Sequence, residues 1–358
     1  MKKLYNKALF YQYLYNGKWI ILFGIIIFYI SVYGETQNLF TALKMNISSI
    51  YTNKMDSRSI FYLFVMCGIL FGIYIFTTGF NKRNNLTFLN ASPFTRKEIK
   101  KNEILFLLYS LSIFTLIFIY MNLCLYYNQR ELLSISYNYI YVLISDTLRL
   151  VFVGCLFIVY LEFMDMIFSN TIFTIIAMII FPLAFICNFL CIISVLKNVK
   201  LFSFGGIINI ILAKIVNIII NYLLLGYYNI SKIESIITYL FLLLIIVVGF
   251  ILIDKINKKF TINNLNKFFS FGIVKKIFIW TTSLSVVNFI VAMLFDNYMY
   301  KKYYEKFYDE SPYYIGEIPL PFNLLEKILI FIIISIIVIL ITKFLVNKIN
   351  KFTNNLTI

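Results

Sequence analysis

The residues of this sequence that could do chemistry in an apolar environment are two pairs of charged side chains. Asp146 and Arg149 lie three residues apart, as do Glu162 and Asp165, in or beside the apolar stretch of residues 139–163. Residues at this spacing share one face of a helix. In an enzyme these four groups would be the candidates for acid–base catalysis. For Asp146 and Arg149 two further interpretations stay open: a local salt bridge, or part of the lining of a transport pathway.

Other catalytic chemistry has little support in the sequence. There is no histidine, which excludes His-based triads, the HExxH zinc motif and haem ligation by histidine. The five cysteines all lie inside apolar stretches, so a disulfide framework is not expected. Cys187 and Cys191 share a helix face, but packing by small side chains is a more ordinary role than metal binding. We expect no metal site and no catalytic residue.

The elements that must position the charged residues are membrane helices. The chain has 358 residues, of which 61% are hydrophobic and 13% charged, whereas soluble domains carry about 25% charged residues. The apolar residues come in blocks near the roughly 20 residues that a membrane helix needs. We therefore predict an all-α polytopic membrane protein with about eight transmembrane helices, at residues 19–33, 59–80, 104–127, 139–163, 170–196, 235–253, 277–295 and 328–345.

The block of residues 207–228 is ambiguous because it is apolar but contains Lys214 and three asparagines. Counting it as a ninth span would place the dense lysine cluster of residues 255–276 outside, against the positive-inside rule. We predict that the outer segment 197–234 instead contains re-entrant helices packed against protein. With eight spans both termini and the loop 81–103 are cytoplasmic, whereas the tyrosine-rich loop 296–326 is outside.

Residues 1–18 alternate lysines with apolar and tyrosine side chains, which predicts an amphipathic helix lying in the membrane interface. Residues 19–253 then form a six-helix core, and residues 254–358 add two more helices. The formal net charge of +16 fits lysines and arginines placed between spans, so we expect membrane lipids and no nucleic acid as partners.

One inner segment reads as the start of a helix. It runs Ala91-Ser-Pro-Phe-Thr-Arg-Lys-Glu-Ile99. Pro93 disfavours a helix before it, and Thr95 with Glu98 matches the capping box, Thr-x-x-Glu. The helix should continue through Lys100 and Lys101 into the third span. Such a basic, capped helix suits docking to another protein, although an ordinary cytoplasmic loop has the same composition. The docking candidates are Phe88, Pro93, Thr95, Arg96, Lys97, Glu98, Lys100 and Lys101.

This segment resembles the Pro-hydrophobic-Ser/Thr-Arg-Lys/Arg-Glu-hydrophobic signature of ABC-2 type exporter permeases, between their second and third membrane helices. The order of parts over residues 1–255 is also similar to that family, including the turn at Phe168-Ser-Asn170 between the fourth and fifth spans. Residues 255–358 depart from the minimal six-helix plan and look like a longer, eight-helix subgroup of bacterial permeases.

The resemblance implies a permease subunit of an ATP-driven exporter in the bacterial cytoplasmic membrane. It would pair with a second permease subunit, as a homodimer or heterodimer, and with a separate ATP-binding subunit. The chain lacks the G-x-x-x-x-G-K-[ST] motif, so ATP and magnesium are expected in that partner. The substrate would be a lipid, a peptide or an amphiphilic drug-like compound. The alternatives are a non-transporting anchor or sensor subunit and a membrane-embedded lipid or glycan transferase.

Overall fold

The structure is a computed structural model that describes residues 6–48, 58–79, 94–135, 139–168, 174–182, 184, 232–259, 272–299 and 324–355. Nearly all of these residues are helical, and none of them belongs to a β-strand. The predicted all-α class is therefore confirmed for the described part of the chain.

Six described helical segments are long and apolar enough to cross a membrane, and a seventh, within α10, is apolar over the shorter range Phe278–Val291. The large apolar side chains exposed on them include Trp19, Phe64, Leu116, Leu244 and Ile337. Exposure of such a surface to water would be strongly unfavourable. Contact with the lipid of a bilayer is what such a surface is suited to. The chain is a multi-pass membrane protein, and the count of eight spans stays a prediction.

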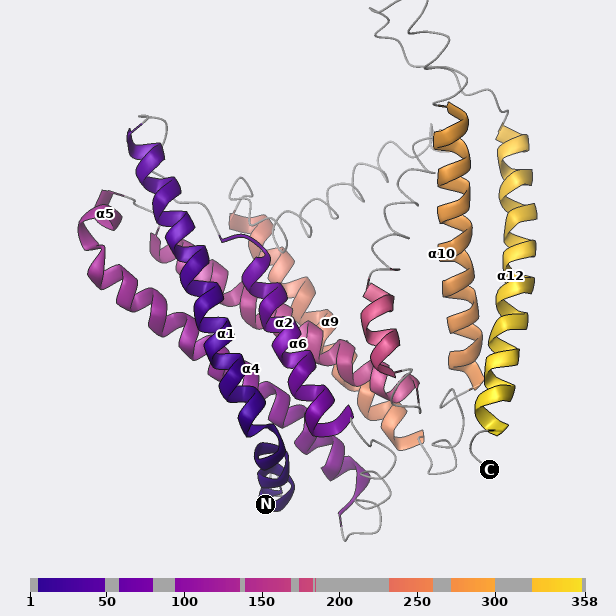
Figure 1. The fold of residues 1–358 in the computed structure, drawn as a ribbon, viewed down its shortest axis with the longest axis horizontal. Helices are drawn as coiled ribbons and strands as arrows, with labels where there is room; N and C mark the ends of the chain where they lie inside the picture. Colours follow the sequence, from indigo (N-terminus) through magenta and orange to yellow (C-terminus); the bar gives the residue numbers. More distant parts are fainter. Residues whose placement is uncertain are drawn as a thin grey trace, which may run out of the picture. The chain divides into compact units, whose positions relative to one another are not determined.

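The chain divides into two compact units, of which the first comprises residues 1–166 and 212–261. Its described elements are α1 (Lys7–Ser48), α2 (Phe61–Tyr74), the π-helical turn η1 (Ile75–Gly79), α4 (Arg96–Asn128), α5 (Arg130–Ile135), α6 (Tyr139–Ile167) and α9 (Lys232–Lys259). Helices α1, α2 and α4 pack against one another, and α4 also contacts α9. Figure 1 shows α1 and α4 running in one direction and α2, α6 and α9 in the other.

Helix α1 buries one narrow stripe of side chains, spaced three or four residues apart, along its whole length. The stripe includes Leu9, Tyr13, Phe28, Val32 and Phe40. The predicted interfacial helix and the predicted first span are parts of this one 42-residue helix. At 1.5 Å per residue it is about 63 Å long, roughly twice the hydrocarbon thickness of a bilayer, so it extends beyond the membrane core.

Two glycines on α1 permit its close approach to neighbouring helices. A Cβ on Gly24 would lie 2.5 Å from Cγ2 of Ile69 on α2, and a Cβ on Gly17 would lie 2.9 Å from both Thr77 and Phe106. Real Cβ atoms do not approach so closely. Small residues at such crossings are the usual means by which membrane helices pack without a hydrophobic driving force between them.

The second unit comprises residues 167–211 and 262–358. Its described helices are residues 174–182, α10 (Gly272–Met299) and α12 (Leu324–Asn355). Helices α10 and α12 form an antiparallel hairpin (Figure 1). Val287, Val291 and Val338 form its core, and the hydroxyls of Ser283 and Thr342 are 2.5 Å apart. The predicted two-helix addition therefore contains two helices that pack together, while its boundary at residue 254 stays a prediction.

Several predicted features lie wholly or mostly outside the described residues. They are the cytoplasmic loop up to residue 93, the turn at residues 169–170, most of the fifth span at residues 170–196, the re-entrant segment up to residue 231 and the outer loop from residue 300 to residue 323. Those predictions remain as stated. The continuation of the capped segment into the third span is confirmed, because α4 is a single helix from Arg96 to Asn128.

Candidate functional site

The predicted capping box is present at the start of α4. Thr95 has extended backbone angles, with φ −76° and ψ 147°. Its hydroxyl accepts a hydrogen bond from the backbone N–H of Glu98 at 3.3 Å. The Glu98 carboxylate in turn accepts from the backbone N–H of Thr95 at 2.9 Å. Two N–H groups that would otherwise lack acceptors are thereby satisfied, which fixes where the helix begins.

The side chains of the first turns of α4 point in three directions. Ile99 packs against Leu9 of α1, with Phe94 beside them. Lys97 faces α9, where its ammonium lies 3.6 Å from the carboxylate of Asp254. Glu98 is exposed, and its carboxylate is bonded to the backbone of Thr95 within the capping box. The predicted docking residues Phe88 and Pro93 lie outside the described residues.

Lys100 points into the bundle, which differs from the expectation that it belongs to an exposed docking surface. Only 7% of the residue is exposed. Its ammonium donates hydrogen bonds to Glu103 and to Asp165, both at 2.9 Å, and it forms an ion pair with Glu162. Lys100 therefore holds the start of α4 to the end of α6, and we leave it out of the proposed docking surface.

The Lys100 cluster, formed by Lys100, Glu103, Glu162, Asp165 and Tyr74, is buried and has an excess of acidic groups. Tyr74 of α2 donates its hydroxyl proton to Asp165 in a short hydrogen bond. One ammonium against three carboxylates gives a formal charge of −2 when all are ionised. Oε1 of Glu162 has no hydrogen-bond partner among the described residues. The cluster connects α2, α4 and α6, and Lys100 provides its only positive charge within the described residues.

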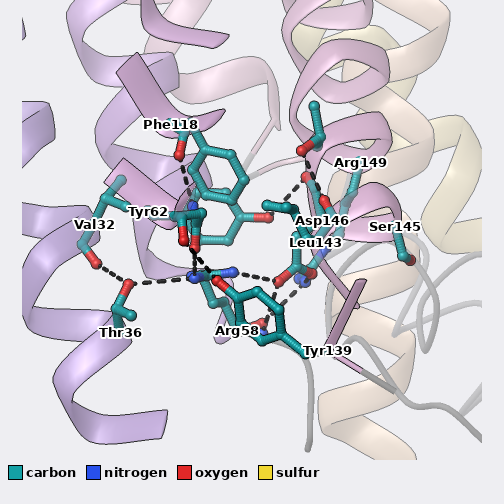
Figure 2. Close-up of polar contacts among 12 residues, drawn as sticks. Val32, Thr36, Arg58, Tyr62, Phe118, Tyr139, Leu143, Ser145, Asp146 and Arg149 are labelled. Carbon is teal, nitrogen blue, oxygen red and sulfur yellow. Dashed lines mark hydrogen bonds and ion pairs between the residues drawn. The ribbon is translucent and has the colours of Figure 1, made fainter. Parts of the chain in front are cut away.

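A second buried cluster lies near the opposite end of the same helices, and Figure 2 shows it in detail. Arg58, three residues before the start of α2, donates from Nη1 to Oδ2 of Asp146 at 3.0 Å. Its other terminal nitrogen donates to the hydroxyl of Thr36 at 3.3 Å and, in a short hydrogen bond, to the side-chain oxygen of Asn122. Arg58 thus connects α1, α4 and α6 through one guanidinium.

Arg149 completes this Arg58 cluster from α6. Its Nη1 donates to the backbone carbonyl of Arg58 at 2.9 Å and lies 3.8 Å from Oδ1 of Asp146. The guanidinium of Arg58 also lies 5.0 Å from the ring centre of Phe118, within range of a cation–π interaction. Two guanidiniums and one carboxylate give a net charge of +1. Asp146 and Arg149 are both at most 1% exposed, and the structural pair and the pathway lining both stay predictions.

The sequence predicted the proximity of Asp146 and Arg149 but missed Arg58, the closer partner of Asp146. In the sequence, Arg58 lies just before an apolar block, which is typical of a solvent-exposed arginine in an outer loop. The signal that could have indicated it is charge balance, since a carboxylate within a predicted span needs a cation. Asp146 and Glu162 are 16 residues apart on α6, about 24 Å along the helix. The two clusters are thus separated by most of the thickness of an apolar bilayer core.

Among the described residues, no group of three His, Cys, Asp or Glu side chains is arranged to hold a metal ion. Cys187 and Cys191 are not among those residues. No family model, curated protein or solved structure matches this chain. The functional interpretation therefore depends on the geometry of the chain itself.

Proposed function

We propose that the chain is the membrane-spanning permease subunit of an ATP-driven exporter of the ABC-2 type in a bacterial cytoplasmic membrane. The supporting observation is the capped first turn of α4. It presents exposed polar side chains at the end of a helix that continues without interruption into the membrane. A partner bound there would act directly on a transmembrane helix.

Lys100 gives this end of α4 a mechanical connection to the rest of the bundle. It lies two residues beyond the capping box, and its ammonium is bonded to carboxylates on α6. A displacement of the first turn would therefore also displace the end of α6. In the proposed mechanism the ATP-binding subunit docks on the first turn, with ATP and magnesium bound in that separate chain. A second permease subunit completes the exporter.

The directions of α6 and α9 support the eight-span count that this proposal uses. Both helices end beside the start of α4, since Glu162 and Asp165 contact Lys100 while Asp254 contacts Lys97. Two helices with the same direction require an odd number of membrane crossings between them. If only the predicted fifth span lies between α6 and α9, there is one crossing and the condition is met. If the segment 207–228 also spans the membrane, there are two crossings and the condition is not met. With the positive-inside rule, we propose that both termini are cytoplasmic.

Co-purification tests the proposed docking surface. We expect the double variant Arg96→Glu with Lys97→Glu to lose most of its association with the ATP-binding subunit, because it reverses two charges in the first turn of α4. The matched control is Lys343→Glu with Lys348→Glu, two exposed lysines on α12, which should associate as the unaltered chain does. Equal association of all three proteins would refute the docking site. Export measured in a deletion strain, with the remaining subunits still assembled, would distinguish a permease from an anchor.

A further inference from the structure

A cavity of about 380 Å³ lies between the first half of α4 and the last part of α9. Its inner lining is apolar and includes Leu105 and Leu108 of α4 and Phe250 of α9. The charged residues Lys97 and Lys101 of α4 and Asp254 of α9 also line it, and we take their end of the cavity as its mouth. Lys100 contributes only its aliphatic chain, because its ammonium is bonded to the buried carboxylates.

The mouth of this cavity carries a net positive charge. Asp254 accepts from Lys258 at 2.9 Å and lies 3.6 Å from Lys97. Lys101 is exposed and has no ion-pair partner among the described residues. Lys258 does not line the cavity but lies beside Asp254, and with it the three ammonium groups and one carboxylate carry a charge of +2. Lys97 and Lys101 are four residues apart, so both ammoniums project from the same face of α4.

The dimensions of the cavity match one leaflet of a bilayer. Lys97 and Leu108 are 11 residues apart, which is about 16 Å along a helix, and half of a hydrocarbon core is about 15 Å. The polar mouth therefore lies at headgroup depth when the apolar part lies among acyl chains. Basic pockets between membrane helices on the cytoplasmic side are a known form of anionic headgroup site.

We propose that this cavity binds an anionic phospholipid of the surrounding membrane. The phosphate lies between the ammoniums of Lys97 and Lys101, and one acyl chain lies along Leu105, Leu108 and Phe250. The charge at the mouth selects an anionic headgroup, and the apolar lining requires a lipid rather than a soluble phosphate compound. Lys97 also belongs to the proposed docking surface, so the lipid site is tested on this chain alone, without an ATP-binding subunit.

Native mass spectrometry of the full chain in detergent provides the test. The probes are phosphatidylglycerol, phosphatidylcholine with the same acyl chains, and inorganic phosphate. We expect phosphatidylglycerol to be retained by the unaltered chain while phosphatidylcholine is released. Each lysine near a membrane surface contributes about 1 kcal/mol to anionic lipid binding, so Lys97→Gln with Lys101→Gln should weaken retention about thirtyfold. Excess inorganic phosphate should not displace the lipid.

Two further variants separate this site from general attraction to a basic protein. Leu105→Trp places a bulky ring in the apolar part and should release the lipid with both lysines intact. Lys343→Gln with Lys348→Gln removes two exposed lysines from α12 and should leave retention unchanged. Equal retention of both lipids, or equal losses in the two lysine variants, would overturn the proposal. If Leu105→Trp does not fold, the comparison of the two exposed lysine pairs still decides the question.

Discussion

The guanidinium of Arg58 lies 3.0 Å from the carboxylate of Asp146, and both side chains are 1% exposed. These residues are 88 positions apart in the chain. Their pairing therefore depends on how α2, which follows Arg58, is placed relative to α6, which contains Asp146. A buried ion pair adds little compared with well-packed apolar residues, but the loss of one partner leaves a costly unpaired charge. Arg58 and Asp146 therefore make the relative placement of α2 and α6 strongly dependent on matching charges.

Exchanging the charges of Asp146 and Arg149 should destabilise the bundle. If Asp146 and Arg149 contacted only each other, the variant Asp146→Arg with Arg149→Asp would keep their attraction. Asp146 is instead bonded to Arg58, so the arginine introduced at position 146 would face the guanidinium of Arg58. We expect a loss of about 3–5 kcal/mol in the free energy of unfolding, measured by denaturation in detergent. The control Arg58→Asp with Asp146→Arg retains opposite charges across the main contact and should lose less. An exchange variant as stable as the unaltered chain would contradict the assignment of Arg58 as the main partner.

Lys100 and Lys101 should respond very differently to loss of charge. Lys100→Met leaves Glu103, Glu162 and Asp165 without their shared cation and should cost about 3–5 kcal/mol. Lys101→Met removes an exposed ammonium and should change stability by less than about 0.5 kcal/mol. Adding Glu162→Gln to Lys100→Met should recover part of the loss, because one buried negative charge is removed with it. Thermal unfolding of the four proteins measures these differences, and equal melting of the two single variants would show that Lys100 is not the central cation.

Gly24 and Gly34 offer a matched pair on α1. An added Cβ at Gly24 would meet Ile69 at 2.5 Å, whereas one at Gly34 has nothing within 4 Å. Gly34→Ala should stabilise the helix by up to about 1 kcal/mol, because alanine has the higher helix propensity. Gly24→Ala gains the same propensity but forces α1 away from α2, at a cost of about 1–3 kcal/mol. Unfolding measurements on both variants test this, and a stabilising Gly24→Ala would mean that the helices do not approach closely.

The capping box should contribute measurably to the first turn of α4. Thr95→Ala removes the acceptor for the N–H of Glu98 and should cost about 1 kcal/mol. Amide hydrogen exchange of residues 96–99 should become faster. Thr115→Ala is the control, because the Thr115 hydroxyl only donates to a carbonyl inside the same helix. Unchanged exchange in Thr95→Ala would show that the helix start is fixed by tertiary contacts alone.

The sequence predicted the features that arise from local interactions. The start of α4 depends on residues three positions apart, so Thr95 and Glu98 were enough to identify it. The clusters could not be identified in the same way, because Lys100 and Asp165 are 65 positions apart. Lysines are usually solvated, which made Lys100 look like a surface residue. A helical signal was nevertheless present, since Lys100 and Glu103 share the buried face that continues through Phe106 and Leu107.

Helix α1 extends beyond the predicted first span of residues 19–33, for a different reason. Hydropathy indicates what lies in lipid rather than where a helix ends, and α1 continues through the polar residues Glu35 and Gln37. No proline interrupts residues 7–48. The stripe of buried residues continues through Thr36 and Phe40, so packing against the neighbouring helices maintains the helix beyond the apolar block.

The orientation of α4 is testable at its two ends. Lys101 and Tyr127 are both exposed, Tyr127 by 81%, and they are 26 residues apart, about 39 Å along the helix. This exceeds the roughly 30 Å of a hydrocarbon core, so the two positions should lie on opposite sides of the membrane. In a background without the five native cysteines, we expect an impermeant thiol reagent to label Tyr127→Cys on intact cells but Lys101→Cys only after permeabilisation. The physical reason is the concentration of lysine and arginine near the start of α4, which the positive-inside rule places in the cytoplasm. The opposite pattern would invert the proposed topology, and labelling of both positions on intact cells would mean that α4 does not cross the membrane.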